Sequence, residues 1–359
     1  MIYLDYQATT PLAPEAREAM LAWLAGPEAM GFANPHSSHR PGRAAAAAVE
    51  VAREQVAALL PPGGRVIFTS GATEAINLAI IGSGRKRLAV SAIEHAAVLD
   101  TARFVDPGVT LLPVDGEGLV APDAPLPDDV GLVAVMQVNN EIGTIQPVGE
   151  IAARARAAGA LFLCDAVQGA GKIAAPEGAD LIALSAHKLY GPKGIGALWV
   201  REGVEVAPLV HGGGQEGGLR SGTLSPALCA GFGAAATLCK TWWESDGQHV
   251  ERLWERARDL FADWTLNGSA EHRWHGNLNI RREGLDVARL LSECRTVAIS
   301  AGSACASGSG RPSHVLRGLG LSDKGTRTAI RIGFGRYTGE EELERAAVAI
   351  NAAARAQGV

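Results

Sequence analysis

The sequence predicts an α/β fold with a mostly parallel sheet, followed by a smaller α+β unit. Between residues 65 and 200, short apolar segments alternate with segments of helical periodicity. The apolar segments are continuous rather than alternating, which is typical of parallel strands covered by helices on both faces. Beyond residue 245 the pattern changes to long amphipathic helices and short strands. A chain of 359 residues also exceeds the usual size of one hydrophobic core.

The expected elements follow in chain order. In the first unit the predicted strands are RVIFTSG (65–71), LAVSAI (88–93), GLVAVMQV (131–138), ALFLCDA (160–166), DLIALSA (180–186) and GALWV (196–200). The predicted helices cover 42–60, 72–80, 147–159 and 226–243. In the second unit we expect a helix over 250–264, strands around 277–280 and 295–300, and a final helix over 339–356. The expected domains are therefore a large one, 15–245, and a small one formed by 1–14 and 246–359.

Composition excludes several classes of partner. The net charge is −5, so we expect no nucleic-acid surface, and no apolar segment approaches the roughly 18 residues that cross a bilayer. Five cysteines without a CxxC pair, and no apolar leader before MIYLDYQATTPL, predict reduced thiols in the cytoplasm. The two histidines of HRWH (272–275) lack further nearby ligands, so no metal site is expected.

Polar side chains gather where the predicted strands end. Ligands of parallel α/β sheets lie outside the carboxyl ends of the strands. The segments at these positions are SGATE (70–74), EH (94–95), NNE (139–141), DAVQ (165–168) and SAHK (185–188). They bring together a possible anion-binding turn, an imidazole, an amide, a carboxylate and an amine.

Each of these features has a second interpretation. SGATE resembles a strand–glycine–helix turn that binds an anion, but it could be a simple helix N-cap. Asp165 could face a cationic ligand or cap the next turn. Lys188 could be a desolvated, nucleophilic amine or a surface lysine. His95 and His187 could both be structural histidines.

The combination is more specific than its parts. An anion-binding turn, an aspartate and a lysine at neighbouring strand ends are the three groups that pyridoxal phosphate (PLP) requires of a protein. They supply the phosphate anchor, the partner of the pyridine nitrogen and the Schiff-base amine. The sequence therefore predicts a PLP site at this edge of the sheet.

Nine segments, in order over nearly the whole chain, resemble the cysteine desulfurases of the class V aminotransferase fold, most strongly the nitrogenase-type and iron–sulfur-assembly branch. They are LDYQATTPL, ANPHSSHRPG, FTSGATEAINLAI, EHAAVLD, VNNEIGTIQPV, CDAVQGAGK, SAHKLYGPKGIGAL, HGGGQEGGLRSGTL and SAGSACASGSGRPSHVLRGLGL. The resemblance implies the PLP-dependent transferase fold type I, with a mostly parallel seven-stranded sheet in the large domain.

The resemblance also implies roles for the residues around PLP. Lys188 would carry the cofactor as a Schiff base, Asp165 would pair with the pyridine nitrogen, and Gln168 would bind the ring hydroxyl. His95 would stack on the ring and move protons. Four residues would hold the phosphate: Ala72, Thr73, Ser185 and His187.

Three further positions would bind the substrate, and one would reach another subunit. Asn140 and Arg331 would hold the carboxylate of L-cysteine, and Asn34 would be another pocket residue. Thr223 would reach the phosphate bound by the partner subunit, which implies a homodimer with shared sites.

Cys305 lies in the Gly/Ser/Ala-rich segment ISAGSACASGSGRPSH (299–314). In the family that this segment resembles, the cysteine at this position takes sulfur from L-cysteine as a persulfide and leaves L-alanine. A thiolate that attacks inside a pocket and delivers sulfur outside it needs a moving loop, which Gly302, Gly308 and Gly310 would allow. The expected partner is a sulfur acceptor, either an iron–sulfur cluster scaffold or a thiolation enzyme. The other four cysteines lie in apolar or helical segments and should be core residues.

Two alternatives remain open at this stage. A class V enzyme acting on another amino acid could be a selenocysteine lyase or an aminotransferase. An aminotransferase would not need Cys305, and turnover of cysteine against selenocysteine would separate the lyase. A cofactor-free interaction protein with the same fold is the second alternative, and a yellow colour of the purified protein would argue against it.

Overall fold

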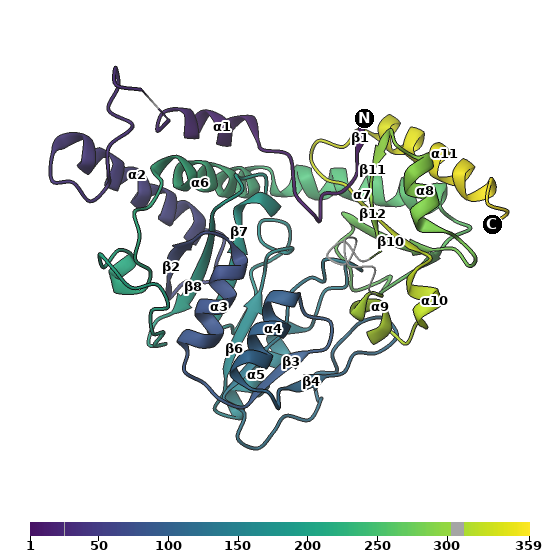
Figure 1. Cartoon of the computed structure of the whole chain (residues 1–359), viewed down its shortest axis with the longest axis horizontal. Coiled ribbons are helices and arrows are strands. Elements are labelled where there is room, and N and C mark those ends of the chain that lie inside the picture. Colours follow the sequence, from purple (N-terminus) through teal and green to yellow (C-terminus); the bar gives the residue numbers. More distant parts are fainter. Residues whose placement is uncertain (25, 303–311) are drawn as a thin grey trace.

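A computed structural model describes residues 1–24, 26–302 and 312–359 (Figure 1). Seven of its strands form one sheet in the order β2-β8-β7-β6-β5-β3-β4. Strand β8 runs antiparallel to β2 and β7, and the other neighbouring pairs are parallel. The predicted mostly parallel seven-stranded sheet is confirmed. The strand bounds are β2 Gly64–Thr69, β3 Leu88–Ser91, β4 Thr110–Leu112, β5 Leu132–Ala134, β6 Leu161–Asp165, β7 Leu181–Ser185 and β8 Gly196–Arg201.

Helices cover both faces of this sheet, as continuous apolar strands require. In β6, Phe162 and Cys164 face one core while Leu163 faces the other. The first core includes α2 (Arg40–Ala57), α5 (Val148–Ala157) and α6 (Pro226–Thr241), and α1 (Pro14–Leu21) packs on α6. The second core includes α3 (Ala72–Gly82) and α4 (Ala96–Val105).

A second layered unit lies beside the large sheet, near both chain ends (Figure 1). Its antiparallel sheet has the order β12-β13-β10-β9, and β1 pairs with β11 in parallel. Its core is formed with α7, α8 and α11. The bounds are β1 Ile2–Tyr3, α7 Trp243–Leu260, β9 Thr265–Leu266, β10 Asn277–Arg281, α8 Val287–Glu293, β11 Val297–Ala298, β12 Ser300–Ala301, α9 His314–Gly318, α10 Asp323–Thr326, β13 Ala329–Gly333 and α11 Glu340–Arg355. The expected domain limits, 15–245 and 1–14 with 246–359, stay a prediction.

Some elements differ from those expected. The segment RTVAIS forms two short strands, because Val297 and Ala298 pair with β1 whereas Ser300 and Ala301 pair with β13. Strand β5 covers only three residues of GLVAVMQV, and β4, α1 and α4 were not expected.

None of the described helices combines the length and the apolar character that crossing a membrane requires.

Candidate active site

The carboxyl ends of β3, β5, β6 and β7 open onto one cavity of about 540 Å³, within the range of small-molecule sites. Ten of the predicted site residues line it: Ala72, Thr73, His95, Asn140, Asp165, Gln168, Ser185, His187, Lys188 and Arg331. Other lining residues were not expected from the sequence, among them Gln7, Ala8, Lys193 and Gly194, whereas Ser70 and Gly71 belong to the predicted SGATE turn. Gln7 and Ala8 belong to the LDYQATTPL segment, but no local pattern indicates that they reach this cavity.

One end of the cavity is the amino terminus of α3. The N-cap Gly71 provides no side-chain cap, and Ala72 and Thr73 are the first helical residues. The first N–H groups of a helix have no intrahelical acceptor and attract anions. Gly196 lies against this turn, because a Cβ on Gly196 would come within 2.6 Å of the Gly71 carbonyl carbon. The geometry favours the anion-binding interpretation of SGATE over a side-chain-capped helix start.

His187 contributes to the same region in its neutral form. Burial, together with the charges of Lys188 and Lys193, lowers the pKa of His187 to about 4. Its Nδ1 lies 3.1 Å from Thr9 Oγ1. At neutral pH the imidazole can therefore take part in hydrogen bonds without adding a charge.

Asp165 ends β6 as a buried carboxylate. Burial raises its pKa, whereas the Val167 N–H, His95 and Lys188 act in the opposite direction. The Val167 N–H donates to Asp165 Oδ1 over 2.9 Å. A carboxylate in this setting is suited to accept a hydrogen bond from a cationic N–H of a ligand.

The side-chain oxygen of Gln168 is a hydrogen-bond acceptor that has no donor among the described residues. Its Nε2 donates to the Gln7 carbonyl over 3.0 Å, while its buried Oε1 has no hydrogen-bond partner among the described residues. Buried amide oxygens are nearly always paired in folded proteins. A ligand hydroxyl at this point would satisfy the orphaned oxygen.

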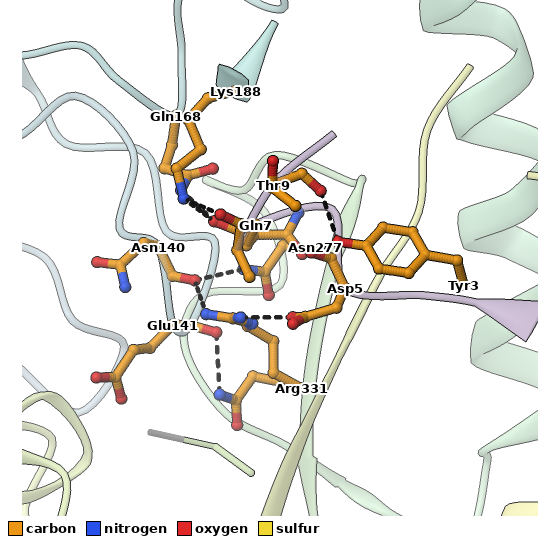
Figure 2. Close-up of polar contacts among 12 residues, drawn as sticks. Tyr3, Asp5, Gln7, Thr9, Asn140, Glu141, Gln168, Lys188, Asn277 and Arg331 are labelled. Atoms are coloured by element: carbon orange, nitrogen blue, oxygen red, sulfur yellow. Dashed lines mark hydrogen bonds and ion pairs between the residues drawn. The ribbon is translucent and has the colours of Figure 1, made fainter. Parts of the chain in front are cut away.

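Lys188 lies in the 3₁₀ turn Ala186–Lys188 that follows β7. Its Nζ donates to the carbonyls of Gln7 and Ala8, the latter over 2.8 Å (Figure 2). These two acceptors are neutral main-chain oxygens, so they orient the amine without adding an opposing charge. This placement supports the nucleophilic interpretation of Lys188 over that of a surface lysine.

His95 is the N-cap of α4 and lines the cavity. Its Nδ1 accepts from the Ala97 N–H over 3.1 Å. A neutral ring in this position therefore carries its proton on Nε2.

Arg331 lies on β13, opposite Asn279 of β10, and its side chain is 1% exposed. Its Nη1 donates to the Asn140 carbonyl over 3.0 Å, and its Nη2 pairs with Asp5 Oδ1 at 2.7 Å (Figure 2). The Asn140 carbonyl also accepts from Asn277 Nδ2 over 3.3 Å. The structure thus brings the two predicted carboxylate-binding residues, Asn140 and Arg331, into direct contact.

A sequence profile described as "Aminotransferase class-V" matches residues 2–346. The chain belongs to the aminotransferase class-V family. A relative named cysteine desulfurase IscS, from Rickettsia akari (strain Hartford), is 42% identical over 368 residues, covering 96% of this chain and 89% of the relative. A solved structure named NifS-like protein is 31% identical with a TM-score of 0.88, covering 98% of each chain. Another, SspA in complex with cysteine, is 35% identical with a TM-score of 0.80, covering 94% of this chain and all of SspA.

Two predicted site residues of this class-V family member, Asn34 and Thr223, do not line the described cavity, and the position of a third is not described. Asn34 is exposed, and its Oδ1 accepts from the His36 N–H over 2.8 Å. Thr223 is exposed on the segment after β8. Cys305 lies outside the described residues. The roles expected for these three residues stay predictions.

The four other cysteines are buried and free, as expected for core residues. Burial raises the pKa of Cys229 to about 12 and that of Cys239 to about 11, and it also raises the pKa values of Cys164 and Cys294. Thiols with such pKa values stay protonated and are poor nucleophiles at neutral pH.

Proposed function

We propose that this class-V family member is a PLP-dependent cysteine desulfurase, which converts L-cysteine to L-alanine and receives the sulfur on Cys305. The observation that carries the proposal is the cavity itself. It combines the Lys188 amine, the Asp165 carboxylate and the uncapped start of α3. The 42% identity to the cysteine desulfurase IscS of Rickettsia akari supports the assignment of the reaction.

The residues present fit PLP. Ala72, Thr73, Ser185 and His187 would hold the phosphate. Asp165 would pair with the pyridine nitrogen, and the orphaned oxygen of Gln168 would accept the ring hydroxyl. Lys188 would hold the cofactor covalently. Bound PLP would supply an electron sink for the charge that develops at the substrate Cα.

The chain's own residues account for substrate binding and proton movement. Arg331 and Asn140 would bind the substrate carboxylate, which places the amino group toward Lys188. Once the Lys188 amine is released from the cofactor, it would take the Cα proton and later return a proton to the substrate. His95, with its proton on Nε2, would exchange protons at the same end of the cavity.

Sulfur transfer needs a nucleophile that the buried cysteines cannot provide. The Cys305 thiolate would attack the substrate sulfur, so that one S–S bond forms and the substrate C–S bond breaks. The electron pair of that bond returns to the substrate carbon, which is then protonated. The sum is L-cysteine plus the Cys305 thiol giving L-alanine plus the Cys305 persulfide.

The proposal extends to assembly and location. Thr223 would reach the partner's phosphate site in a homodimer, Asn34 would line the complete pocket, and a separate acceptor protein would collect the persulfide sulfur. Free buried cysteines are typical of proteins in a reducing compartment, which supports a cytoplasmic location for this protein. Cysteine is favoured over selenocysteine because the similar protein SspA was solved with cysteine.

The test is the release of L-alanine and sulfide from L-cysteine under reducing conditions. Wild-type protein should form the two products in equal amounts, and Lys188→Ala should lose at least about a thousandfold in rate. Lys86→Ala is the control, since Lys86 is an exposed lysine that does not line the cavity, and this variant should keep wild-type turnover. Equal turnover by wild type and Lys188→Ala would contradict the proposal, as would turnover of selenocysteine but not cysteine.

A further inference from the structure

The guanidinium of Arg331 is held from outside the cavity by a residue that does not line it. Asp5 Oδ1 binds Nη2 at 2.7 Å, and the Asn140 carbonyl binds Nη1 at 3.0 Å. Asp5 is not among the residues that line the cavity. We propose that Asp5 is a positioning residue that fixes Arg331 in the orientation that binds the α-carboxylate of the substrate. This inference rests on the proposed function.

Burial explains why Arg331 needs such a partner. The Arg331 side chain is 1% exposed and that of Asp5 is 18% exposed. The Arg331 Nε is also buried and has no partner among the described residues. A buried guanidinium that loses its counter-charge turns toward water or toward other acceptors. Asp5 therefore compensates the charge and fixes one terminal nitrogen while Asn140 fixes the other.

Asp5 is itself fixed by the short segment that follows β1. The Gly333 N–H donates to the Leu4 carbonyl over 2.8 Å, and Asp5 forms a parallel bridge with Gly333. The Tyr3 hydroxyl lies 2.8 Å from the Thr9 carbonyl and 3.2 Å from that of Asp5 (Figure 2). The carboxylate is thus presented to Arg331 by paired backbone rather than by a free loop.

The same segment also holds Lys188, a second cation of the cavity. The carbonyls of Gln7 and Ala8 accept from Lys188 Nζ, only two and three residues beyond Asp5. Residues 5–8 thus fix the position of the Lys188 amine relative to the Arg331 guanidinium. A substrate held by both groups needs its amino group and its carboxylate at matching positions. The ligand class that depends on Asp5 is therefore α-amino carboxylates, whereas amines without a carboxylate need only Lys188.

Asp5→Asn tests this inference in the PLP-loaded protein. L-alanine and ethylamine are the probes, with binding followed through the visible absorbance of the cofactor, and KM and kcat are measured for L-cysteine. Loss of one charge-assisted contact should weaken L-alanine binding and raise KM about tenfold, while kcat changes less than about threefold. Ethylamine binding should stay unchanged, and Asp5→Glu should recover part of the loss.

Asp246→Asn is the matched control. Asp246 pairs with the buried Arg336 at 2.6 Å, with side-chain exposures of 19% and 4%, and neither residue lines the cavity. A general loss of stability should appear in both variants, but the loss of carboxylate binding should appear only in Asp5→Asn. If Asp5→Asn does not fold, Asp5→Glu takes its place. It keeps the charge, but its longer side chain displaces the guanidinium, so part of the loss of L-alanine binding should remain.

Any of three results with the variants would overturn the inference: L-alanine binding unchanged in a folded Asp5 variant, equal loss for L-alanine and ethylamine, or the same loss in Asp246→Asn. Failure of the wild type to bind L-alanine in preference to ethylamine would do so as well. The proposed function fails separately, if wild-type protein binds L-alanine but releases no sulfide from L-cysteine.

Discussion

Titratable side chains around the cavity are buried, and burial disfavours their charged forms. The hydrogen bonds and charges of their neighbours determine which of them stay charged. Glu141, next to Asn140, is a buried carboxyl group whose Oε2 accepts from the Ser313 hydroxyl over 2.5 Å. Burial raises the pKa of Glu141 to about 7, although Ser313, Arg331 and His95 act in the opposite direction. Glu141 therefore titrates near neutral pH, beside the proposed carboxylate-binding residue Asn140.

The stability of the protein should reflect this titration. Between its usual pKa of 4.5 and about 7, Glu141 keeps its proton in the folded protein but has lost it in the unfolded chain. The folded state then binds more protons, so the free energy of unfolding contributed by Glu141 falls as the pH rises through this window. Over the whole window the loss is about 3 kcal/mol.

Glu141→Gln should remove this contribution, because glutamine does not titrate. Urea unfolding of both proteins at several pH values between 5 and 8 measures it. We expect the variant to gain stability relative to wild type as the pH rises across this range. Parallel curves for the two proteins would show that Glu141 does not titrate there. Glu117→Gln is a control with another carboxyl group that accepts from a serine hydroxyl, that of Ser269.

At the level of helices and strands, the elements that could be predicted from the sequence were those with a long or repeated apolar pattern. Helices α2, α7 and α11 were predicted because apolar positions recur at helical spacing over 16 residues or more. The short strands β4, β11 and β12 were missed or merged, because two or three residues carry no periodicity. Their positions depend on pairing with β3, β1 and β13, which local sequence does not encode.

The same contrast applies to the site. Asp165, Gln168, Ser185 and Lys188 could be predicted because parallel strands bring their carboxyl ends to one edge of the sheet. Asp5, Gln7 and Ala8 could not, since their contacts to Arg331 and Lys188 span 180 residues or more of the chain. Arg331 was predicted only through the family resemblance, because an arginine within a strand gives no local sign of burial.

For the whole molecule, the proposed homodimer makes each site depend on two chains. Thr223 is exposed and does not line the cavity of its own chain. Its segment is anchored to the large sheet, because Glu216 accepts from Arg53 and from the Phe68 N–H at 2.7 Å. Arg220 pairs with Glu74 in the first turn of α3 at 2.8 Å. The segment thus starts beside the amino terminus of α3 in one subunit, and in the proposed dimer it would extend toward the other.

Mixed dimers test this arrangement. Thr223→Val should weaken PLP binding about tenfold through the lost hydroxyl, and Lys188→Ala should be inactive. A dimer with one subunit of each kind contains one site with Lys188 from the first chain and Thr223 from the second. We expect PLP affinity and turnover at that site to return to wild-type values. Mixed dimers no better than Thr223→Val itself would place Thr223 outside the partner's site.

The central claim is that Cys305 receives the sulfur of L-cysteine at this PLP site. The most direct measurement is the mass of the Cys305 peptide after incubation of the PLP-loaded protein with L-cysteine, without reductant and with L-alanine measured in parallel. The account predicts one additional sulfur atom on Cys305, formed together with L-alanine, and no sulfur gain on Cys164, Cys229, Cys239 or Cys294. L-alanine formed without added sulfur on Cys305, or formed at the wild-type rate by Cys305→Ser, would contradict it.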